Sequence, residues 1–357
     1  MKPLHIGKTR IDPAALAATL TLGALGGLTG WTLSLPLPLL LGSLLAVGGA
    51  ALLGLRPFWQ PVHLPQPLRQ SFIPVVGVAI GGAFTPTLLQ GVTDWIPSLI
   101  ALCLYIPLAH FLGYRIYRAG GLSPVTAYFG AVPGGLIESV TMGEEAGADV
   151  ATLVLIQFLR LILTIVAVPV LFVVLTGVQV GSSAGAQMAG SDMPLGLWDV
   201  GVLLIAGVVG YFGGRALQLP AAIMTGPLLL SALAHLAGLT SAVPPPWTIA
   251  VTQVVVGAGL GARFAGMNGA TLRRGFGLAI VTSVVLLGLA FGFAEALHGL
   301  VGVDIAAAFL AFAPGGITEM SLIALSLNIS VVYVTFHHVV RIVLAVSLAR
   351  AFAPRVK

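Results

Sequence analysis

Runs of apolar residues recur along the whole of this 357-residue chain. Each run is about 18 to 25 residues long, which is the length that an α-helix needs to cross a bilayer. Hydrophobic residues make up 58% of the chain and charged residues 8%. A soluble fold cannot bury so large an apolar fraction, and the alternating pattern of a membrane barrel is missing. The sequence therefore predicts an all-α polytopic membrane protein.

Each half of the chain contains six of these runs. They cover residues 14–33, 36–55, 72–92, 95–117, 124–146 and 150–176 in the first half, and 198–216, 221–240, 247–267, 275–297, 305–327 and 330–352 in the second. A stretch rich in Gly, Ser and Ala separates the halves and is typical of a linker. We predict a first membrane repeat at 1–176, a linker at 177–196 and a second membrane repeat at 197–357. No signal-peptide cleavage site follows the first run, so we interpret that run as a span.

One motif, Pro-Gly-Gly-x-x-Glu, occurs once in each half inside an apolar run. Its residues are Pro133, Gly134, Gly135 and Glu138 in the first half, and Pro314, Gly315, Gly316 and Glu319 in the second. Proline and paired glycines interrupt the hydrogen bonds of a helix. In a bilayer the freed backbone groups must be buried in protein or face a water-filled cavity. The motif therefore predicts a helix break that contributes to a binding site.

An arginine follows each motif glutamate after 22 residues, as the pairs Glu138–Arg160 and Glu319–Arg341 show. Both arginines lie about ten residues inside an apolar run, too deep for their charge to reach the membrane surface easily. Three residues before them stand Gln157 and His338. The equal spacing indicates an internal duplication. We predict that these four residues and the two motifs bind the substrate or a coupling ion.

The motif glutamates have two interpretations. A carboxylate at membrane depth is costly and is usually functional or paired. Glu138 and Glu319 either bind ligand or protons, or form structural ion pairs with Arg160 and Arg341, within one half or across the halves. Two such pairs would form a neutral cluster that the arrival of a substrate or proton could open. The role of His338 is equally open, because a histidine can pass protons or pack a helix interface.

The basic residues predict how the halves cross the membrane. If the second half runs opposite to the first, all fourteen Lys and Arg outside Arg160 and Arg341 fall on the cytoplasmic side. A parallel second half would place Arg215 and Arg263 outside. Inversion requires an odd number of crossings, so we expect about five spans per repeat plus a broken or re-entrant Pro-Gly-Gly segment. We therefore expect two inverted repeats in a bacterial inner membrane, with both termini in the cytoplasm.

Other classes of protein find little support. Cys103 is the only cysteine, and the chain has neither a His/Cys cluster nor a nucleotide-binding loop. His337 and His338 are adjacent and point to different faces of a helix. We expect no metal, no cofactor and no enzymatic activity. The basic residues are scattered at the ends of apolar runs, so we expect no nucleic-acid partner.

The two motifs and the residues after them resemble the AbrB-type bacterial membrane proteins with an internal duplication. The resemblance covers nearly the whole chain through residues 131–138, 147–150 and 157–160 and their second-half counterparts. This family also carries an ammonia monooxygenase label, but the metal ligands that oxygen activation needs are missing here. A soluble DNA-binding regulator shares the family name, and the hydropathy excludes it. The resemblance implies at most an indirect effect on gene expression.

Inverted repeats with interrupted segments at matching positions are typical of secondary transporters. We therefore predict a secondary active transporter of a small organic metabolite, working by alternating access around the paired motifs. The two arginines favour an organic anion, while the two glutamates leave a cation or an amine as the alternative. The lack of an ATP-binding motif favours coupling to protons or Na⁺. A membrane sensor that regulates gene expression indirectly is the alternative, and a channel is a third option. The expected partners are the substrate, the coupling ion and the lipid bilayer, and a homodimer is left open.

Overall fold

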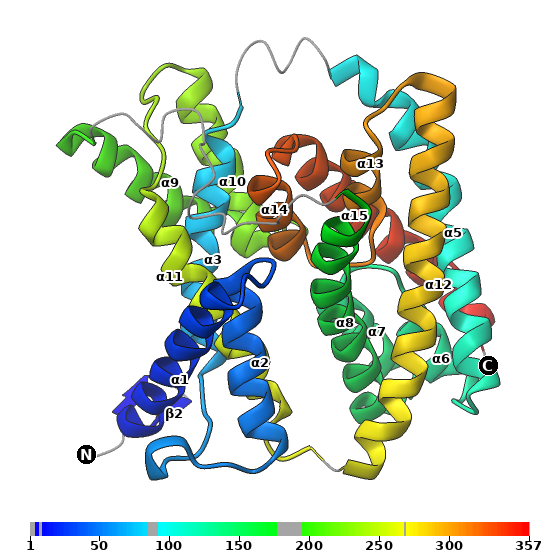
Figure 1. The fold of residues 1–357 in the computed structure, drawn as a ribbon. Coiled ribbons are helices and arrows are strands. Elements are labelled where there is room, and N and C mark those ends of the chain that lie inside the picture. The colour runs from blue at the N-terminus through cyan, green and yellow to red at the C-terminus, as the bar shows by residue number, and fades with distance from the viewer. Residues whose placement is uncertain (1–3, 7–8, 85–91, 177–194, 268, 357) are drawn as a thin grey trace. The chain divides into compact units, whose positions relative to one another are not determined.

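The computed structural model describes residues 4–6, 9–84, 92–176, 195–267 and 269–356. Nearly all of the described chain is helical (Figure 1), as the apolar runs predict. One short antiparallel hairpin of β1 (Leu4–Ile6) and β2 (Thr9–Ile11) precedes the first helix, with Leu4 opposite Ile11. The predicted linker falls almost wholly on 177–194, outside the described residues, as does the part of the third run at 85–91.

A helix lies in each of the twelve predicted runs. The first half contains α1 (Pro13–Thr32), α2 (Pro38–Leu52), α3 (Gln66–Gly81), α5 (Ile96–Ala119), α6 (Pro124–Ala131), α7 (Leu136–Glu145) and α8 (Val150–Thr176). The second half contains α9 (Leu197–Ala216), α10 (Ala222–Leu236), α11 (Pro246–Gly261), α12 (Gly269–Val301), α13 (Ile305–Phe312), α14 (Ile317–Ser326) and α15 (Val331–Phe352). Short 3-10 turns η1 (Pro57–Trp59), η2 (Val92–Trp95), η4 (Ala262–Phe264) and η5 (Ala353–Arg355) flank some of them.

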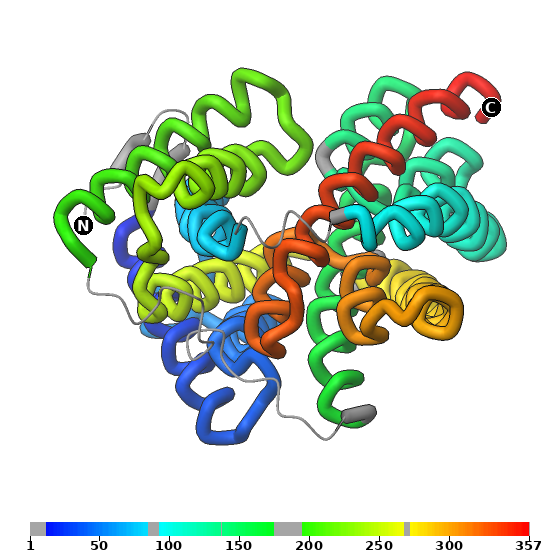
Figure 2. Tube along the Cα trace, turned by 90° about the horizontal axis from the view of Figure 1, so that it is seen from above, coloured from blue at the N-terminus to red at the C-terminus, as the bar shows by residue number. Residues whose placement is uncertain are grey.

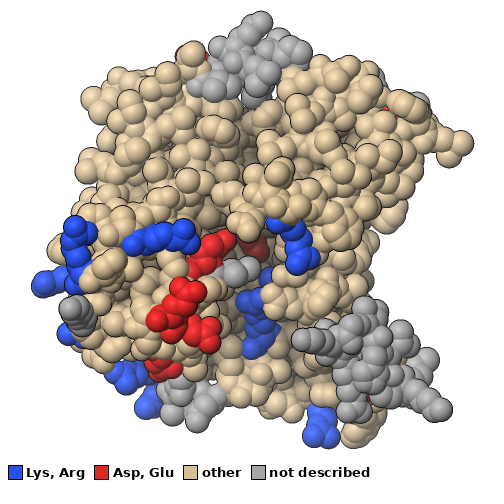
Figure 3. Space-filling model, turned by 180° about the vertical axis from the view of Figure 1, so that it is seen from behind, with Lys and Arg blue, Asp and Glu red and all other residues tan. Residues whose placement is uncertain are grey.

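Seven of the described helical segments are long and apolar enough to cross a membrane. They are Pro13–Thr32, Thr93–Ala119, Val150–Val174, Leu197–Ala216, Pro246–Phe264, Leu272–Val301 and Val331–Arg355. Helices α2, α10 and α14 are apolar but shorter. On the face drawn in Figure 3, charged side chains occupy small patches and most of the visible surface is uncharged. The prediction of a multi-pass membrane protein is confirmed, while the number of ten spans and their orientation stay predictions.

The helices group into two compact units. The first unit comprises Met1–Thr85, Pro169–Met267 and Leu325–Asn328, and the second comprises Pro86–Val168, Asn268–Ala324 and Ile329–Lys357. Each unit therefore takes helices from both halves of the sequence. Helices α1, α2, α3, α9, α10 and α11 belong to the first unit, and the two Pro-Gly-Gly segments belong to the second. The repeats predicted from the sequence are continuous stretches of the chain, whereas each unit combines stretches from both halves. The units therefore do not test the predicted repeat boundaries, which stay a prediction.

Glycines let the helices of the first unit approach closely. A Cβ atom added at Gly42 of α2 would lie closer than 3.0 Å to the backbone of Gly26 in α1. A Cβ atom added at Gly226 of α10 would likewise lie closer than 3.0 Å to the backbone of Gly210 in α9. Both pairs of glycines are sixteen residues apart in the sequence. Equivalent helices of the two halves therefore pack in the same way.

A second pair of glycines links the halves. A Cβ atom added at Gly77 of α3 would lie 2.6 Å from the carbonyl oxygen of Met224 in α10. A Cβ atom added at Gly257 of α11 would collide with the carbonyl oxygen of Leu40 in α2. The third helix of each half thus packs against the second helix of the other half. Small residues at such contacts allow the backbones of two helices to approach closely.

Replacing Gly226 by alanine is expected to destabilise the first unit. The three atoms nearest to an added Cβ are all backbone atoms of Gly210 and Gly214, so no side chain can move aside. Overpacking of this kind costs about 1–3 kcal/mol, and we expect a lower midpoint in a thermal-unfolding assay of the detergent-solubilised protein. Gly213→Ala in α9 is the matched control, because an added Cβ there meets no atom within 4 Å. Equal midpoints for the two variants would contradict the packing argument.

In the second unit, α5 and α12 lie side by side, as Figures 1 and 2 both show. Three aromatic rings join these helices to α13. The ring centroid of Tyr105 lies 5.4 Å from that of Phe293 and 5.1 Å from that of Phe312, and the latter two are 5.7 Å apart. This contact places the last residue of α13, where the second Pro-Gly-Gly segment begins, directly on α5.

Candidate functional site

Each Pro-Gly-Gly segment divides one apolar run into two short helices. Helix α6 ends at Ala131 and α7 begins at Leu136, while α13 ends at Phe312 and α14 begins at Ile317. Helices of 8 and 10 residues are about 12 and 15 Å long, which is too short to cross a bilayer of about 30 Å. Gly135, which precedes α7, has a φ of 66°, a value that favours glycine. The predicted break is therefore present in both halves.

Side-chain caps mark the starts of α6 and α13, the helices that precede the two breaks. Ser123 accepts a hydrogen bond from the backbone N–H of Thr126 at the start of α6, and Asp304 accepts one from Ala307 at 2.7 Å at the start of α13. Ser123 and Asp304 hold equivalent positions in the two halves. Side-chain oxygen acceptors of this kind satisfy backbone donors that a helix leaves free. The two caps therefore lie at matching distances from the two breaks, although the residue types differ.

The last helix of each half is capped in the same way. Asp149 accepts from the backbone N–H of Thr152 at 3.2 Å and from its hydroxyl at 2.6 Å, and these bonds lower the pKa of the Asp149 carboxyl below its usual value. The equivalent Ser330 accepts from Tyr333 at 3.4 Å. The sequence difference at this position is thus a change between two helix caps.

Arg160 reaches from α8 to the end of α6. Its Nη2 donates to the carbonyl oxygen of Val132 at 2.8 Å, and its Nη1 donates to that of Gly130 at 3.3 Å. These carbonyls belong to the last turn of α6 and the residue after it, where the helix leaves acceptors without partners. A cation at this end also interacts favourably with the helix dipole. Arg160 therefore stabilises the first half of the broken helix.

Arg341 does the same for the second break and makes more contacts. Its guanidinium donates to the carbonyl oxygens of Phe312 at 3.5 Å, of Ala313, and of Gly315 at 2.6 Å. Only 1% of its surface is exposed. Ala313 is the counterpart of Val132 in the first half. The two deep arginines of the sequence thus have equivalent roles at the two breaks.

Gln157 and His338 also hold equivalent places. Nε2 of Gln157 donates to the carbonyl oxygen of Phe129 at 2.9 Å, and Nε2 of His338 lies 2.9 Å from that of Leu310. Because a carbonyl only accepts, the His338 proton is assigned to Nε2. Its Nδ1 is then free to accept from Nη2 of Arg341 at 3.0 Å. This pattern gives a neutral His338 that orients the arginine.

The motif glutamates lie at the third position of the helix after each break. The carboxylate of Glu138 approaches Gly135, where a Cβ would lie 3.1 Å from its Oε2, and a Cβ at Gly316 would collide with Oε2 of Glu319. At a helix N-terminus the macrodipole stabilises a negative charge. Glu138 is half-buried and Glu319 is buried. The pairing of these glutamates with the arginines stays a prediction.

The last helix of each half also contacts the break of the other half. A Cβ at Gly134 would lie 3.5 Å from Cγ1 of Ile342 in α15, and a Cβ at Gly316 would lie 3.3 Å from Cδ1 of Leu161 in α8. Ile342 and Leu161 each directly follow the deep arginine of their half, Arg341 and Arg160. The predicted site residues of both halves are therefore brought together within the second unit.

Two further polar residues contribute to this site and carry no motif in the sequence. Ser139 accepts a hydrogen bond from Nε2 of Gln157 at 2.5 Å. Tyr105 is fully buried, and its hydroxyl has no hydrogen-bond partner among the described residues. The charges of Arg160 and Arg341 both act on it. An isolated polar side chain inside an apolar run was the only signal that could have indicated either residue.

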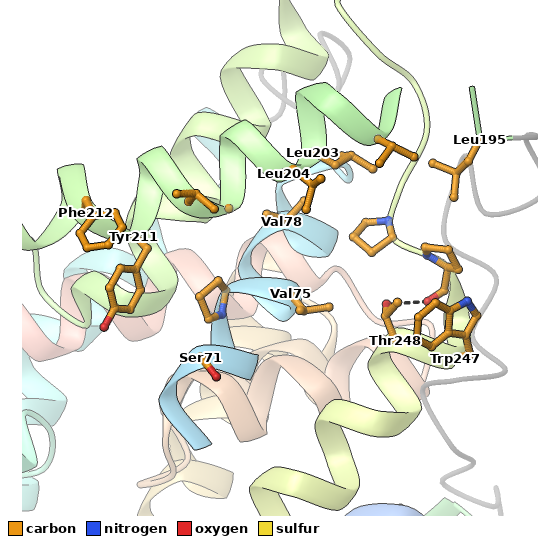
Figure 4. Close-up of a pocket in the computed structure, with 16 residues that line it drawn as sticks. Ser71, Val75, Val78, Leu195, Leu203, Leu204, Tyr211, Phe212, Trp247 and Thr248 are labelled. Atoms are coloured by element: carbon orange, nitrogen blue, oxygen red, sulfur yellow. Dashed lines mark hydrogen bonds between the residues drawn. The ribbon is translucent and has the colours of Figure 1, made fainter. Parts of the chain in front are cut away.

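The described part of the chain holds no group of three or more His, Cys, Asp or Glu side chains placed to bind a metal ion. It does hold a cavity in the first unit, away from the Pro-Gly-Gly segments. This cavity has a volume of about 800 Å³ and is lined mainly by apolar side chains of α3 and α9 (Figure 4). None of its lining residues belongs to the Pro-Gly-Gly segments.

Comparison with known proteins adds a family. The profile of the AbrB family, described as transition state regulatory protein AbrB, matches residues 39–357. The chain is similar to the uncharacterized protein YhjN of Bacillus subtilis, with 28% identity over 78% of this chain and 76% of the relative. It is also similar to a protein named putative regulator AbrB of Escherichia coli, with 26% identity over 82% of each chain.

Proposed function

We propose that this chain, which belongs to the AbrB family of multi-pass membrane proteins, is a secondary active transporter of a small organic metabolite. The observation that carries the proposal is the pair of broken helices, held open at equivalent positions by Arg160 and Arg341. Interrupted helices at matching positions of two repeats form the binding sites of many secondary transporters. We infer that the two repeats are inverted and that access alternates around the paired breaks.

An organic anion is the favoured substrate. Nε of Arg341 and the hydroxyl of Tyr105 are both buried and have no hydrogen-bond partner among the described residues. Both residues contact Phe312. Arg341 donates to the carbonyl oxygen of Phe312, and the ring of Tyr105 packs against the ring of Phe312. Buried donors without acceptors are costly. A carboxylate placed beside Phe312 would accept from both of them, and charge-assisted hydrogen bonds of this kind are strong.

The proposed transporter couples the substrate to protons or Na⁺. A gradient-driven carrier needs a group whose charge changes when the coupling ion binds, and Glu138 and Glu319 are the carboxylates at the breaks. We place both termini in the cytoplasm of a bacterium, from the distribution of Lys and Arg, and we assign no enzymatic step, cofactor or nucleic acid to the protein. A homodimer is compatible with this proposal.

The direct test is a flux assay in proteoliposomes, with small organic acids and amines offered under an imposed proton or Na⁺ gradient. We expect saturable, gradient-driven uptake of an organic acid. Uptake that does not saturate and never runs uphill would indicate a channel. If folded and correctly oriented protein transports no compound, the transporter proposal fails. The second candidate, a membrane sensor with an indirect effect on gene expression, would then be favoured, since a relative and the family profile carry the name of a regulator.

Tyr105→Phe is expected to raise the KM for the transported acid at least tenfold, because a hydrogen bond to a charged group contributes about 1.5–3 kcal/mol. The substitution removes an unpartnered hydroxyl and keeps the ring contacts with Phe293 and Phe312, so the fold should persist. The control is Tyr114→Phe, a half-buried tyrosine of the same helix. An unchanged KM in the Tyr105 variant would remove this hydroxyl from the binding site.

A further inference from the structure

The cavity in the first unit is an elongated apolar groove. Its walls come from α3 and α9 and from the segment that leads into α11. Val78 of α3, Leu204, Gly207, Val208 and Tyr211 of α9, and Trp247 of α11 are among the residues that line it. Figure 4 shows Tyr211 and Phe212 toward one end and Leu195 and Trp247 toward the other. The groove therefore follows α9 along most of its length.

The outer face of α9 does not pack against other described helices. Leu204, Val208 and Phe212 are all exposed, at 62%, 55% and 64%. Gly207 widens the groove, because a Cβ there would meet only Val78, at 3.7 Å. In a helix predicted to span a bilayer, such a face is covered by lipid or by another helix.

The two ends of the groove differ in charge. Arg215 lies in the last turn of α9, where its Nη1 donates to the hydroxyl of Tyr211 at 3.0 Å and its guanidinium carbon lies 5.5 Å from the centre of that ring. Arg215 is exposed. Asp199 lies in the first turn of α9, and it accepts hydrogen bonds from Thr240 and Gly196. A negatively charged group is therefore attracted to one end of the groove only.

We propose that this groove binds an anionic phospholipid, with the phosphate on Arg215 and Tyr211 and one acyl chain along the α3–α9 groove. From Tyr211 to Val200 the helix rises about 16 Å at 1.5 Å per residue, which is about half of the 30 Å hydrocarbon core and matches the depth of one leaflet. An arginine that hydrogen-bonds a tyrosine offers donors to a phosphate.

To test this, the full chain is purified in detergent and reconstituted in vesicles of phosphatidylcholine and phosphatidylglycerol at 3:1. It is then extracted with detergent again, and native mass spectrometry identifies the lipids that it retains. We expect the wild type to retain one phosphatidylglycerol in preference to phosphatidylcholine. Gly207→Leu places a side chain in the groove and is expected to reduce retention at least fivefold. Gly213→Leu is its matched control on the same helix, since an added Cβ there meets no atom within 4 Å.

The headgroup contact has its own pair of variants. Arg215→Gln is expected to abolish the preference for phosphatidylglycerol, whereas Arg350→Gln, an exposed arginine in the last turn of α15, should leave it unchanged. Equal retention in the Gly207 and Gly213 variants, or equal retention of the two lipids by the wild type, would overturn the proposal. A dimer that carries no lipid and dissociates in the Gly207→Leu variant would also overturn it and assign the groove to a second copy of the chain.

Discussion

Replacing Arg341 by alanine is expected to prevent the second broken helix from folding. The guanidinium is the donor to three backbone carbonyls at the end of α13 and just after it, and it is almost fully buried. Water has little access to a side chain that is so fully buried. Each buried acceptor left without a donor costs about 1–3 kcal/mol. The sum is comparable to the whole net stability of many domains, which is about 5–15 kcal/mol.

Three comparisons make this prediction specific. Arg341→Lys should restore little, because an ammonium is a compact charge and cannot bridge several carbonyls as the planar guanidinium does. Arg160→Ala should be milder, since Arg160 donates to two carbonyls at the first break. Arg350→Ala, at an exposed position in the same helix, should leave stability unchanged. The yield of monodisperse protein and its thermal midpoint measure these effects. A folded Arg341→Ala protein with a wild-type midpoint would show that the carbonyls are satisfied in another way.

The positions of the helices and of both breaks could be predicted because the bilayer leaves few choices. An apolar run of the required length can only be helical, and Pro314 with its two glycines can only interrupt it. The start of α3 was less predictable. Its first turns, from Gln66 on, carry polar and basic residues, so the hydropathy places the run at 72–92 while the helix itself occupies Gln66–Gly81.

The contacts inside the site could not be predicted in the same way. The acceptors for Arg160 and Arg341 are backbone carbonyls, which every residue possesses and which leave no mark in a sequence. The sequence offered the glutamates as one set of partners, because they are the visible opposite charges, and that pairing stays a prediction. Tyr105 escaped notice for a related reason, since a tyrosine in an apolar run is more often a packing residue. Each unit combines helices from both halves of the chain, and this arrangement depends on close contacts such as that of Gly77 with Met224. The hydrophobic pattern of a single helix gives no information about such contacts.

The double replacement Glu138→Gln/Glu319→Gln is expected to abolish coupled transport while leaving a folded protein. Glutamine keeps the size of the side chain, so the close approach to Gly135 and Gly316 is preserved. It cannot release or take up a proton, and it carries no charge for Na⁺. The variant therefore resembles a carrier whose coupling site is permanently neutral. In proteoliposomes we expect gradient-driven uptake to fall by more than 100-fold, while exchange of substrate at equal concentrations on both sides persists.

The single variants should separate the two carboxylates. Glu138 is half-buried and Glu319 is buried against its helix break, so Glu138 is the more accessible to an arriving ion. We expect Glu138→Gln to lose coupling without a change in thermal midpoint, and Glu319→Gln to lose both coupling and some stability. Glu144→Gln, an exposed position near the end of α7, is the control and should transport normally. A double variant that still accumulates substrate against its gradient would show that coupling depends on other groups, and the proposed role of these carboxylates would have to be abandoned.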